Sequence, residues 1–116
     1  MAWNSFTNQR QPPMGLFSFL FGNKNEKITD FVSRDAVILD VRTPQEFADG
    51  AIAGSTNIPL QQLSENMDVI KNWHKPVIAC CASGIRSGNA AKMLRAQGIE
   101  AINGGGWFKL NQQINP

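Results

Sequence analysis

Short apolar runs alternate with helical stretches from Lys27 onward, a pattern typical of an α/β unit with a mainly parallel sheet. The run from Val37 to Val41 is apolar except for Asp40, as expected of a strand that is buried on both faces. A second buried strand is predicted over Val77 to Cys80, and a last strand over Ile99 to Ile102. The pattern therefore predicts a small α/β domain.

Capping residues predict where the helix after the first strand begins. Thr43 is a suitable N-cap, Pro44 is a first-turn proline and Glu46 is a capping-box glutamate, so a helix is expected to begin at Pro44. This helix is short and ends by Gly50. The segment from Gly54 to Pro59 predicts a turn that leads into a brief extended stretch.

Three further elements are predicted in the second half of the chain. Apolar spacing favours a helix over Ser64 to Trp73. Ser87 is expected to open another helix, which stops at Gly98. The positions of this helix that face inward are Ala90, Ala91 and Leu94. Gly104 to Gly106 predict a turn, after which a short helix ends the chain.

The first 25 residues carry only two charges and lack both the strand alternation and the helical period of the rest. We expect residues 1–25 to form a flexible N-terminal extension and residues 26–116 to form the domain. Met14 is a candidate internal start, which would leave the first thirteen residues outside the natural protein. The apolar run from Leu16 to Phe21 is expected to pack on the domain as a cap, the alternative being a docking segment for a partner or membrane.

Length, composition and charge narrow the class of protein. The chain has 116 residues, room for one small domain, and 42% of them are hydrophobic, enough for a packed interior. Eleven Lys and Arg residues oppose nine Asp and Glu residues, and no basic stripe is present. Nucleic-acid binding therefore lacks its usual electrostatic footprint, and so does binding to an anionic membrane surface. We expect small or protein-like partners and a monomer.

The apolar run from Leu16 to Phe21 and the two cysteines both favour a location in the cytoplasm. The run is far shorter than the ~20 residues of a spanning helix, so no stable membrane insertion is expected. It also lacks the flanks of a signal peptide. Cys80 and Cys81 are adjacent and too close for an unstrained disulfide, which favours reduced thiols. The predicted location is the cytoplasm.

The segment from Cys81 to Ser87, called the cysteine loop below, joins the end of a buried strand to the start of a helix. Ligands of open α/β sheets bind at such edges, and a tight loop there can turn several backbone N–H groups inward. These dipoles and Arg86 would stabilise a Cys81 thiolate and make it nucleophilic. Gly84 allows a backbone conformation that other residues resist. The alternative is that Cys81 is a buried small hydrophobe and Arg86 a surface charge.

Three ordered motifs, over roughly residues 27 to 112, resemble those of single-domain rhodanese-like sulfurtransferases. They are Leu39 to Phe47, Asn57 to Leu60, and the cysteine loop. The resemblance implies a rhodanese-like α/β fold, a small mainly parallel sheet flanked by helices on both faces. It implies that Cys81 carries sulfur and that Arg86 helps to bind an anionic donor. It also assigns the anion-binding loop, which comprises Ala82, Ser83, Gly84, Ile85, Arg86 and Ser87.

The resemblance further implies a reaction. Sulfur would pass from a thiosulfate-like donor to Cys81 as a persulfide, and then to cyanide, a thiol or a sulfur-carrier protein, without cofactor or metal. One alternative is a small Cys-loop phosphatase or arsenate-reductase-like enzyme. The six residues from Cys81 to Arg86 match the rhodanese length, whereas related phosphatases have one more. The other alternative is a non-catalytic binding module, which usually lacks the cysteine or the arginine.

Four further residues have two interpretations each. Asp40 and Arg42 are possible supporting residues of the site. Because Glu46 lies four residues beyond Arg42, a buried ion pair or capping network that ties the strand to the helix is favoured. Cys80 is expected to fill the core, because neighbouring strand residues point to opposite faces. The alternative is that Cys80 resolves a persulfide on Cys81. His74, the only histidine, could form a Cys-His couple with Cys81. It is instead expected to be a turn residue, roughly 20 Å from Cys81 if the intervening stretch is extended.

Overall fold

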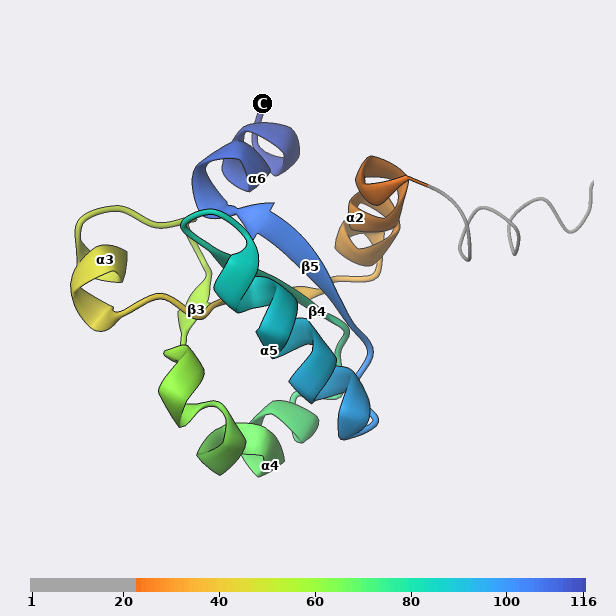
Figure 1. Cartoon of the computed structure of the whole chain (residues 1–116). Helices are drawn as coiled ribbons and strands as arrows, with labels where there is room; N and C mark the ends of the chain where they lie inside the picture. Colours follow the sequence, from red (N-terminus) through yellow and green to blue (C-terminus); the bar gives the residue numbers. More distant parts are fainter. Residues whose placement is uncertain (1–22) are drawn as a thin grey trace, which may run out of the picture.

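The computed structural model describes residues 23–116, which form a four-stranded sheet between two layers of helices (Figure 1). The expectations for the extension up to residue 22, including the apolar cap, lie outside the described residues. In chain order the elements are α2 (Lys24–Ser33), β2 (Val37–Asp40), α3 (Pro44–Ala48), β3 (Thr56–Asn57), two 3₁₀ turns (Leu60–Gln62 and Ser64–Asn66), α4 (Met67–Lys71), β4 (Val77–Cys81), α5 (Ile85–Ala96), β5 (Ala101–Gly106) and α6 (Trp107–Ile114).

The strands are ordered β3-β2-β4-β5 and every pairing is parallel. Their carboxyl ends therefore meet at one edge of the sheet, where Asp40 of β2 lies opposite Cys80 of β4. All five residues of β4 are buried, as the apolar run predicted for a strand covered on both faces. The fold class predicted from the sequence is confirmed.

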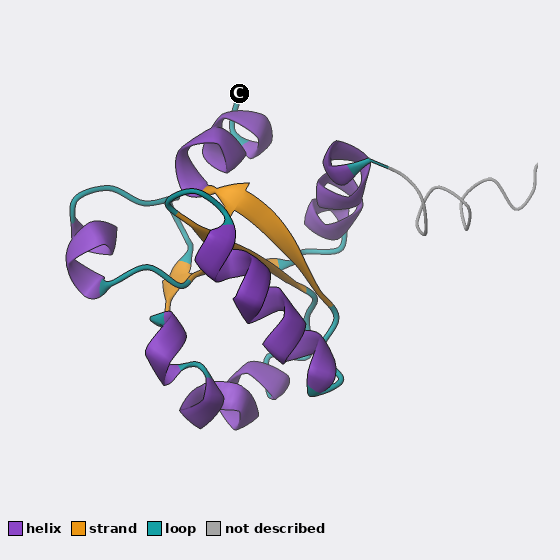
Figure 2. Ribbon diagram, viewed as in Figure 1, coloured by secondary structure: helices purple, strands orange, loops and turns teal. Residues whose placement is uncertain are grey.

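Alternation along β4 divides the core into two clusters. Val77, Ala79 and Cys81 face the cluster that contains Ala90 and Leu94 of α5. Ile78 and Cys80 face a second cluster, which also contains Ile28, Phe31 and Leu110 from α2 and α6. Figure 2 shows these helices on the two sides of the strands. The inward positions predicted for α5 are confirmed, since Ala90, Ala91 and Leu94 are buried.

Helix α3 begins where its capping residues predict. The Thr43 hydroxyl accepts a hydrogen bond from the Glu46 N–H at 3.2 Å, and a Glu46 carboxylate oxygen accepts one from the Thr43 N–H at 3.0 Å. Pro44 occupies the first turn, where a backbone N–H has no partner within the helix, so the missing N–H of proline costs no hydrogen bond. The short helix ends at Ala48, before Gly50 as expected.

Two predicted boundaries differ from the structure. Helix α5 begins at Ile85, two residues before Ser87, because Gly84 is its N-cap and the Gly88 N–H donates to the Gly84 carbonyl. Only Ala82, Ser83 and Gly84 of the cysteine loop therefore lie outside regular secondary structure. The stretch from Ser64 to Trp73 is not one helix, because a 3₁₀ turn precedes the short α4 and Asn66, the last residue of that turn, departs from helical backbone angles.

The prediction of a turn at Gly104 to Gly106 is wrong, because these residues belong to β5, where Gly105 and Gly106 pair with β4. The reason is steric. A Cβ atom at Gly104 would lie 2.6 Å from Ile78 Cγ2, and one at Gly106 would lie 2.8 Å from the Ala82 carbonyl oxygen. The glycines thus permit the close approach of β5 to its neighbours.

Helix α2 was not predicted and crosses the boundary expected between residues 25 and 26. Asn23 and Glu26 form a complete capping box at its start. Ile28 and Phe31 on its inner face are each 1% exposed, so this helix supplies much of the second core cluster. Burying two such side chains contributes about 1.5–3 kcal/mol each.

Candidate active site

Cys81 is the last residue of β4, and three further residues separate it from α5 at the carboxyl edge of the sheet. Its Sγ atom accepts hydrogen bonds from the Gly84 N–H at 3.0 Å and from the Ser87 N–H at 3.4 Å. The Ser87 hydroxyl oxygen lies 3.3 Å from Sγ. The cysteine loop thus curls over its own sulfur atom and turns donors toward it, the arrangement of an anion-binding nest.

This geometry sets the ionisation of Cys81. Burial by itself would raise the pKa of the thiol, but hydrogen bonds from the Ser87 hydroxyl and from the N–H groups of Ser87, Gly84 and Ser83 outweigh burial and lower the pKa. A lowered pKa increases the thiolate fraction near neutral pH, and the thiolate is the nucleophilic form.

Cys80 has the opposite environment. Its side chain is 0% exposed on the other face of the sheet, among Ile28, Phe31 and Leu110. Burial, with the Asp40 carboxylate nearby, raises its pKa to about 12. The expectation that Cys80 fills the core is confirmed, because two adjacent strand residues point in opposite directions.

Alkylation of the native protein is expected to modify Cys81 and to spare Cys80. Because the pKa of Cys81 is lowered, the rate of alkylation of Cys81 should rise with pH, and the midpoint of this rise should lie at a lower pH than for an unperturbed cysteine. Ser87→Ala removes a donor to the thiolate and should move this midpoint to higher pH. Iodoacetamide labelling across a pH series, read by peptide mass, measures both effects. Equal labelling of the two cysteines in the folded protein would contradict this assignment.

Arg86 lies in the first turn of α5, and its guanidinium forms a two-point ion pair with the Glu46 carboxylate of α3, at 2.8 and 3.1 Å. The ion pair joins the cysteine loop to α3. Arg86, followed by the Thr43 N–H, lowers the pKa of Glu46 to about 2, so the pair stays ionised at neutral pH. A donor anion would therefore share this guanidinium with Glu46.

Glu46 is a residue of the site that the sequence interpretation placed in a helix cap and in a network with Arg42, away from the cysteine loop. The capping box that it forms with Thr43 is a local signal, but its second partner, Arg86, is 40 residues away. Nothing in the spacing along the chain indicates that contact. The structure brings α3 beside the cysteine loop because both follow the carboxyl ends of adjacent strands, β2 and β4.

Asp40 and Arg42 form a buried ion pair with each other, so the structural role favoured from the sequence is confirmed, but the carboxylate of Glu46 pairs with Arg86 and not with Arg42. Asp40 is 0% and Arg42 4% exposed, and the shortest nitrogen–oxygen distance is 2.7 Å. Arg42 also donates to the carbonyl oxygens of Glu46 and Gly50, at 3.2 and 2.8 Å, and its guanidinium lies 4.7 Å from the centre of the Trp107 ring. These contacts tie β2 to α3 and α6.

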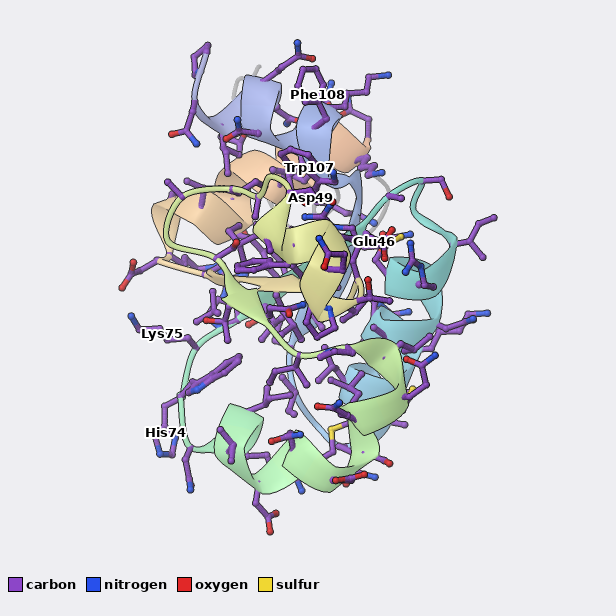
Figure 3. All side chains as sticks on the ribbon, turned by 90° about the vertical axis from the view of Figure 1, so that its left-hand side faces the viewer. Glu46, Asp49, His74, Lys75, Trp107 and Phe108 are labelled. Carbon is purple, nitrogen blue, oxygen red and sulfur yellow. The ribbon has the colours of Figure 1, made fainter. Side chains whose placement is uncertain are left out.

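His74 lies in the turn before β4, at the end of the sheet opposite Cys81. Figure 3 shows His74 and Lys75 far from Glu46, the ion-pair partner of Arg86. The structure therefore does not bring the histidine to the cysteine loop, and activation of Cys81 rests on the loop's own donors.

Among residues 23–116 no cluster of His, Cys, Asp and Glu could hold a metal ion. No helix in the same part of the chain is long and apolar enough to cross a membrane.

The fold and the cysteine loop define an α/β protein with a cysteine, surrounded by hydrogen-bond donors, at the carboxyl edge of a parallel sheet. A family model for the Rhodanese-like domain matches residues 25–113, so the chain belongs to the rhodanese-like domain family. Its structure is similar to the crystal structure of a rhodanese-related protein of Thermoplasma volcanium, with a TM-score of 0.64 and 27% identity over 78% of this chain and 89% of that one.

Two curated relatives illustrate what the chain is similar to. The uncharacterized protein YqhL of Bacillus subtilis is 46% identical over 77 residues, which cover 66% of this chain and 60% of that protein. The thiosulfate sulfurtransferase GlpE of Pseudoalteromonas translucida is 34% identical over 68 residues, 59% of this chain and 64% of that protein. The chain thus spans less than two thirds of the length of these relatives.

Proposed function

We propose that the chain is a sulfurtransferase in which Cys81 carries sulfur as a persulfide. The observation that carries the proposal is the set of donors around Sγ, namely the Gly84 N–H at 3.0 Å, the Ser87 N–H at 3.4 Å and the Ser87 hydroxyl oxygen at 3.3 Å. These groups stabilise a negative charge at the loop both before the reaction, as a thiolate, and after it, as a persulfide anion. The similarity to a thiosulfate sulfurtransferase supports the same chemistry.

The reaction has two balanced steps. The Cys81 thiolate attacks the outer sulfur of thiosulfate, a sulfur–sulfur bond forms to Sγ, and sulfite leaves with the electron pair of the broken bond. An acceptor nucleophile then attacks the outer sulfur of the persulfide, and the Cys81 thiolate is released. With cyanide the product is thiocyanate. Neither step needs a general base once Cys81 is ionised, which fits the position of His74 away from the site.

Glu46 favours sulfur transfer over phosphate-ester hydrolysis. A phosphatase needs a proton donor for its leaving oxygen. Glu46 is the carboxylic acid that contacts Arg86, but its pKa of about 2 keeps it ionised and unable to donate a proton at neutral pH. A thiosulfate-like donor needs no such proton, because sulfite leaves as a stable anion.

The partners in this proposal are a small anionic sulfur donor and an acceptor that is cyanide in vitro and a thiol or sulfur-carrier protein in the cell. The persulfide on Cys81 takes the place of a cofactor. We propose that the protein acts in the cytoplasm as a monomer.

The test is the intact mass of the reduced protein before and after addition of thiosulfate. We expect a gain of one sulfur atom, its removal by cyanide with release of thiocyanate, and no gain in Cys81→Ser. Cys80→Ser is the matched control and should still take up sulfur, because Cys80 faces the other side of the sheet. A Cys81 that is readily alkylated but takes no sulfur would contradict the proposal.

A further inference from the structure

We propose that Asn103, on β5, is a positioning residue of the cysteine loop, and that its side-chain amide holds the loop's donors in place around Sγ. This inference rests on the proposed function, since it concerns the same site. Asn103 makes no hydrogen bond to Sγ itself. It acts through Gly84 and Ser87, two of the residues whose groups surround the sulfur atom.

The Asn103 amide makes three hydrogen bonds. Its Nδ2 donates to the Gly84 carbonyl at 2.9 Å, and its Oδ1 accepts from the Gly105 N–H at 2.9 Å. A backbone N–H only donates and a carbonyl only accepts, so these two bonds fix which end of the amide is oxygen. The Ser87 hydroxyl, 2.7 Å from the same Oδ1, therefore donates to it.

The bond to Gly84 holds the residue at which the loop turns into α5. Gly84 has a left-handed backbone with φ of +103°, is the N-cap of α5 and directs its N–H at Sγ. Glycine populates several backbone conformations about equally, so the contacts around Gly84 select this one. The Asn103 amide and the first turn of α5 hold the Gly84 carbonyl from two directions, because the Gly88 N–H donates to the same oxygen.

The bond to Ser87 aligns the hydroxyl beside the sulfur. The hydroxyl has one hydrogen and two acceptors in reach, Oδ1 of Asn103 at 2.7 Å and Sγ at 3.3 Å. A charged thiolate is the stronger acceptor, so the hydrogen can turn to Sγ when Cys81 ionises. While Cys81 is not ionised, the hydrogen bond to Asn103 holds the Ser87 hydroxyl group within reach of Sγ.

Two irregularities of the backbone accommodate the Asn103 amide. The register between β4 and β5 shifts after Ala79, which pairs with Asn103, so that Cys80 pairs with Gly105 and Gly104 is the extra residue of a bulge. Bulges commonly redirect a side chain next to an active site. Gly88 lies inside α5, where glycine costs about 1 kcal/mol relative to alanine, and a Cβ atom there would lie 3.2 Å from Asn103 Nδ2. The need to leave space for the Asn103 amide explains why residue 88 is a glycine.

Asn103→Leu tests the proposal, since leucine has a similar volume and makes none of the three bonds. We expect sulfur uptake from thiosulfate, per folded molecule, to slow about tenfold to a hundredfold. A second readout is the preference of Cys81 for anionic iodoacetate over neutral iodoacetamide, relative to a peptide thiol. The wild-type loop should favour the anion, and the variant should lose that preference.

Asn57→Leu is the matched control. Asn57 lies on β3 and its amide also donates to backbone carbonyls, those of Asp40 and Arg42, each at 3.0 Å. Its loss should lower stability and leave the reagent preference of Cys81 intact. Equal loss of preference in both variants would show a general loosening of the fold and overturn the proposal, as would an unchanged preference in Asn103→Leu.

Gly88→Ala covers the case in which Asn103→Leu does not fold. It improves helix propensity and crowds the Asn103 amide, so it should preserve the fold and still weaken the anion preference. An unchanged preference in Gly88→Ala would count against the proposal. The alkylation readout also separates this inference from the proposed function, because it needs no sulfur donor: a wild type that favours iodoacetate but takes no sulfur contradicts sulfur transfer alone.

Discussion

Replacing Arg42 by methionine is expected to lower the free energy of unfolding by about 3–5 kcal/mol, because it leaves a buried carboxylate without its partner. The guanidinium makes three contacts shorter than 3.1 Å with Asp40, which is 0% exposed. It also satisfies the carbonyl oxygens of Glu46 and Gly50. Methionine fills a similar space but donates no hydrogen bond, so the loss is electrostatic rather than a cavity. Urea unfolding measures it.

Arg34→Met is the control for this prediction. Arg34 also pairs with two carboxylates, Asp30 at 3.0 Å and Glu100 at 2.7 Å, but its side chain is 39% exposed. Solvent screens such pairs, and we expect a loss of about 1 kcal/mol or less. If both variants lost the same stability, burial of the Asp40–Arg42 pair would not be the cause. The double variant Asp40→Leu with Arg42→Met should recover part of the loss, because no unpaired charge remains.

Local signals in the sequence were sufficient for the features that depend on neighbouring residues. The capping box of Thr43 and Glu46 fixed the start of α3, and the unbroken apolar run from Val77 predicted a strand covered on both faces. Helix α2 has an equally local signal in Asn23 and Glu26. The boundary expected after residue 25 separates that cap from its helix, which is why the helix was not predicted.

Contacts between distant residues left no such signal. The ion pair of Glu46 with Arg86 and the bonds from Asn103 to Gly84 and Ser87 exist because α3, α5 and β5 meet at one edge of the sheet. Three consecutive glycines are poor strand formers, so propensity predicted a turn at Gly104 to Gly106. Pairing with β4 outweighs that propensity, and the absence of side chains is what lets the strand fit.

Gly106→Ala is expected to slow sulfur uptake by Cys81 about a hundredfold while the fold is retained, since displacements of about 1 Å can have effects of this size. The backbone of Gly106 has φ of −68° and ψ of 135°, which alanine adopts without strain. Its Cβ atom would nevertheless lie 2.8 Å from the Ala82 carbonyl oxygen. That carbonyl belongs to the residue after Cys81 and must move, and the movement shifts the cysteine loop.

Gly54→Ala should show the reverse pattern and so separates loop geometry from stability. Gly54 has φ of +83°, and no atom lies within 4 Å of the place that an alanine methyl group would take, so alanine there is strained but contacts no part of the cysteine loop. We expect it to lose about 1–2 kcal/mol of stability and to keep its rate of sulfur uptake. Thermal unfolding and sulfur uptake, measured on both variants, distinguish the two effects. A Gly106→Ala protein that takes up sulfur at the wild-type rate would show that the loop tolerates the displaced carbonyl, and that β5 does not set its geometry.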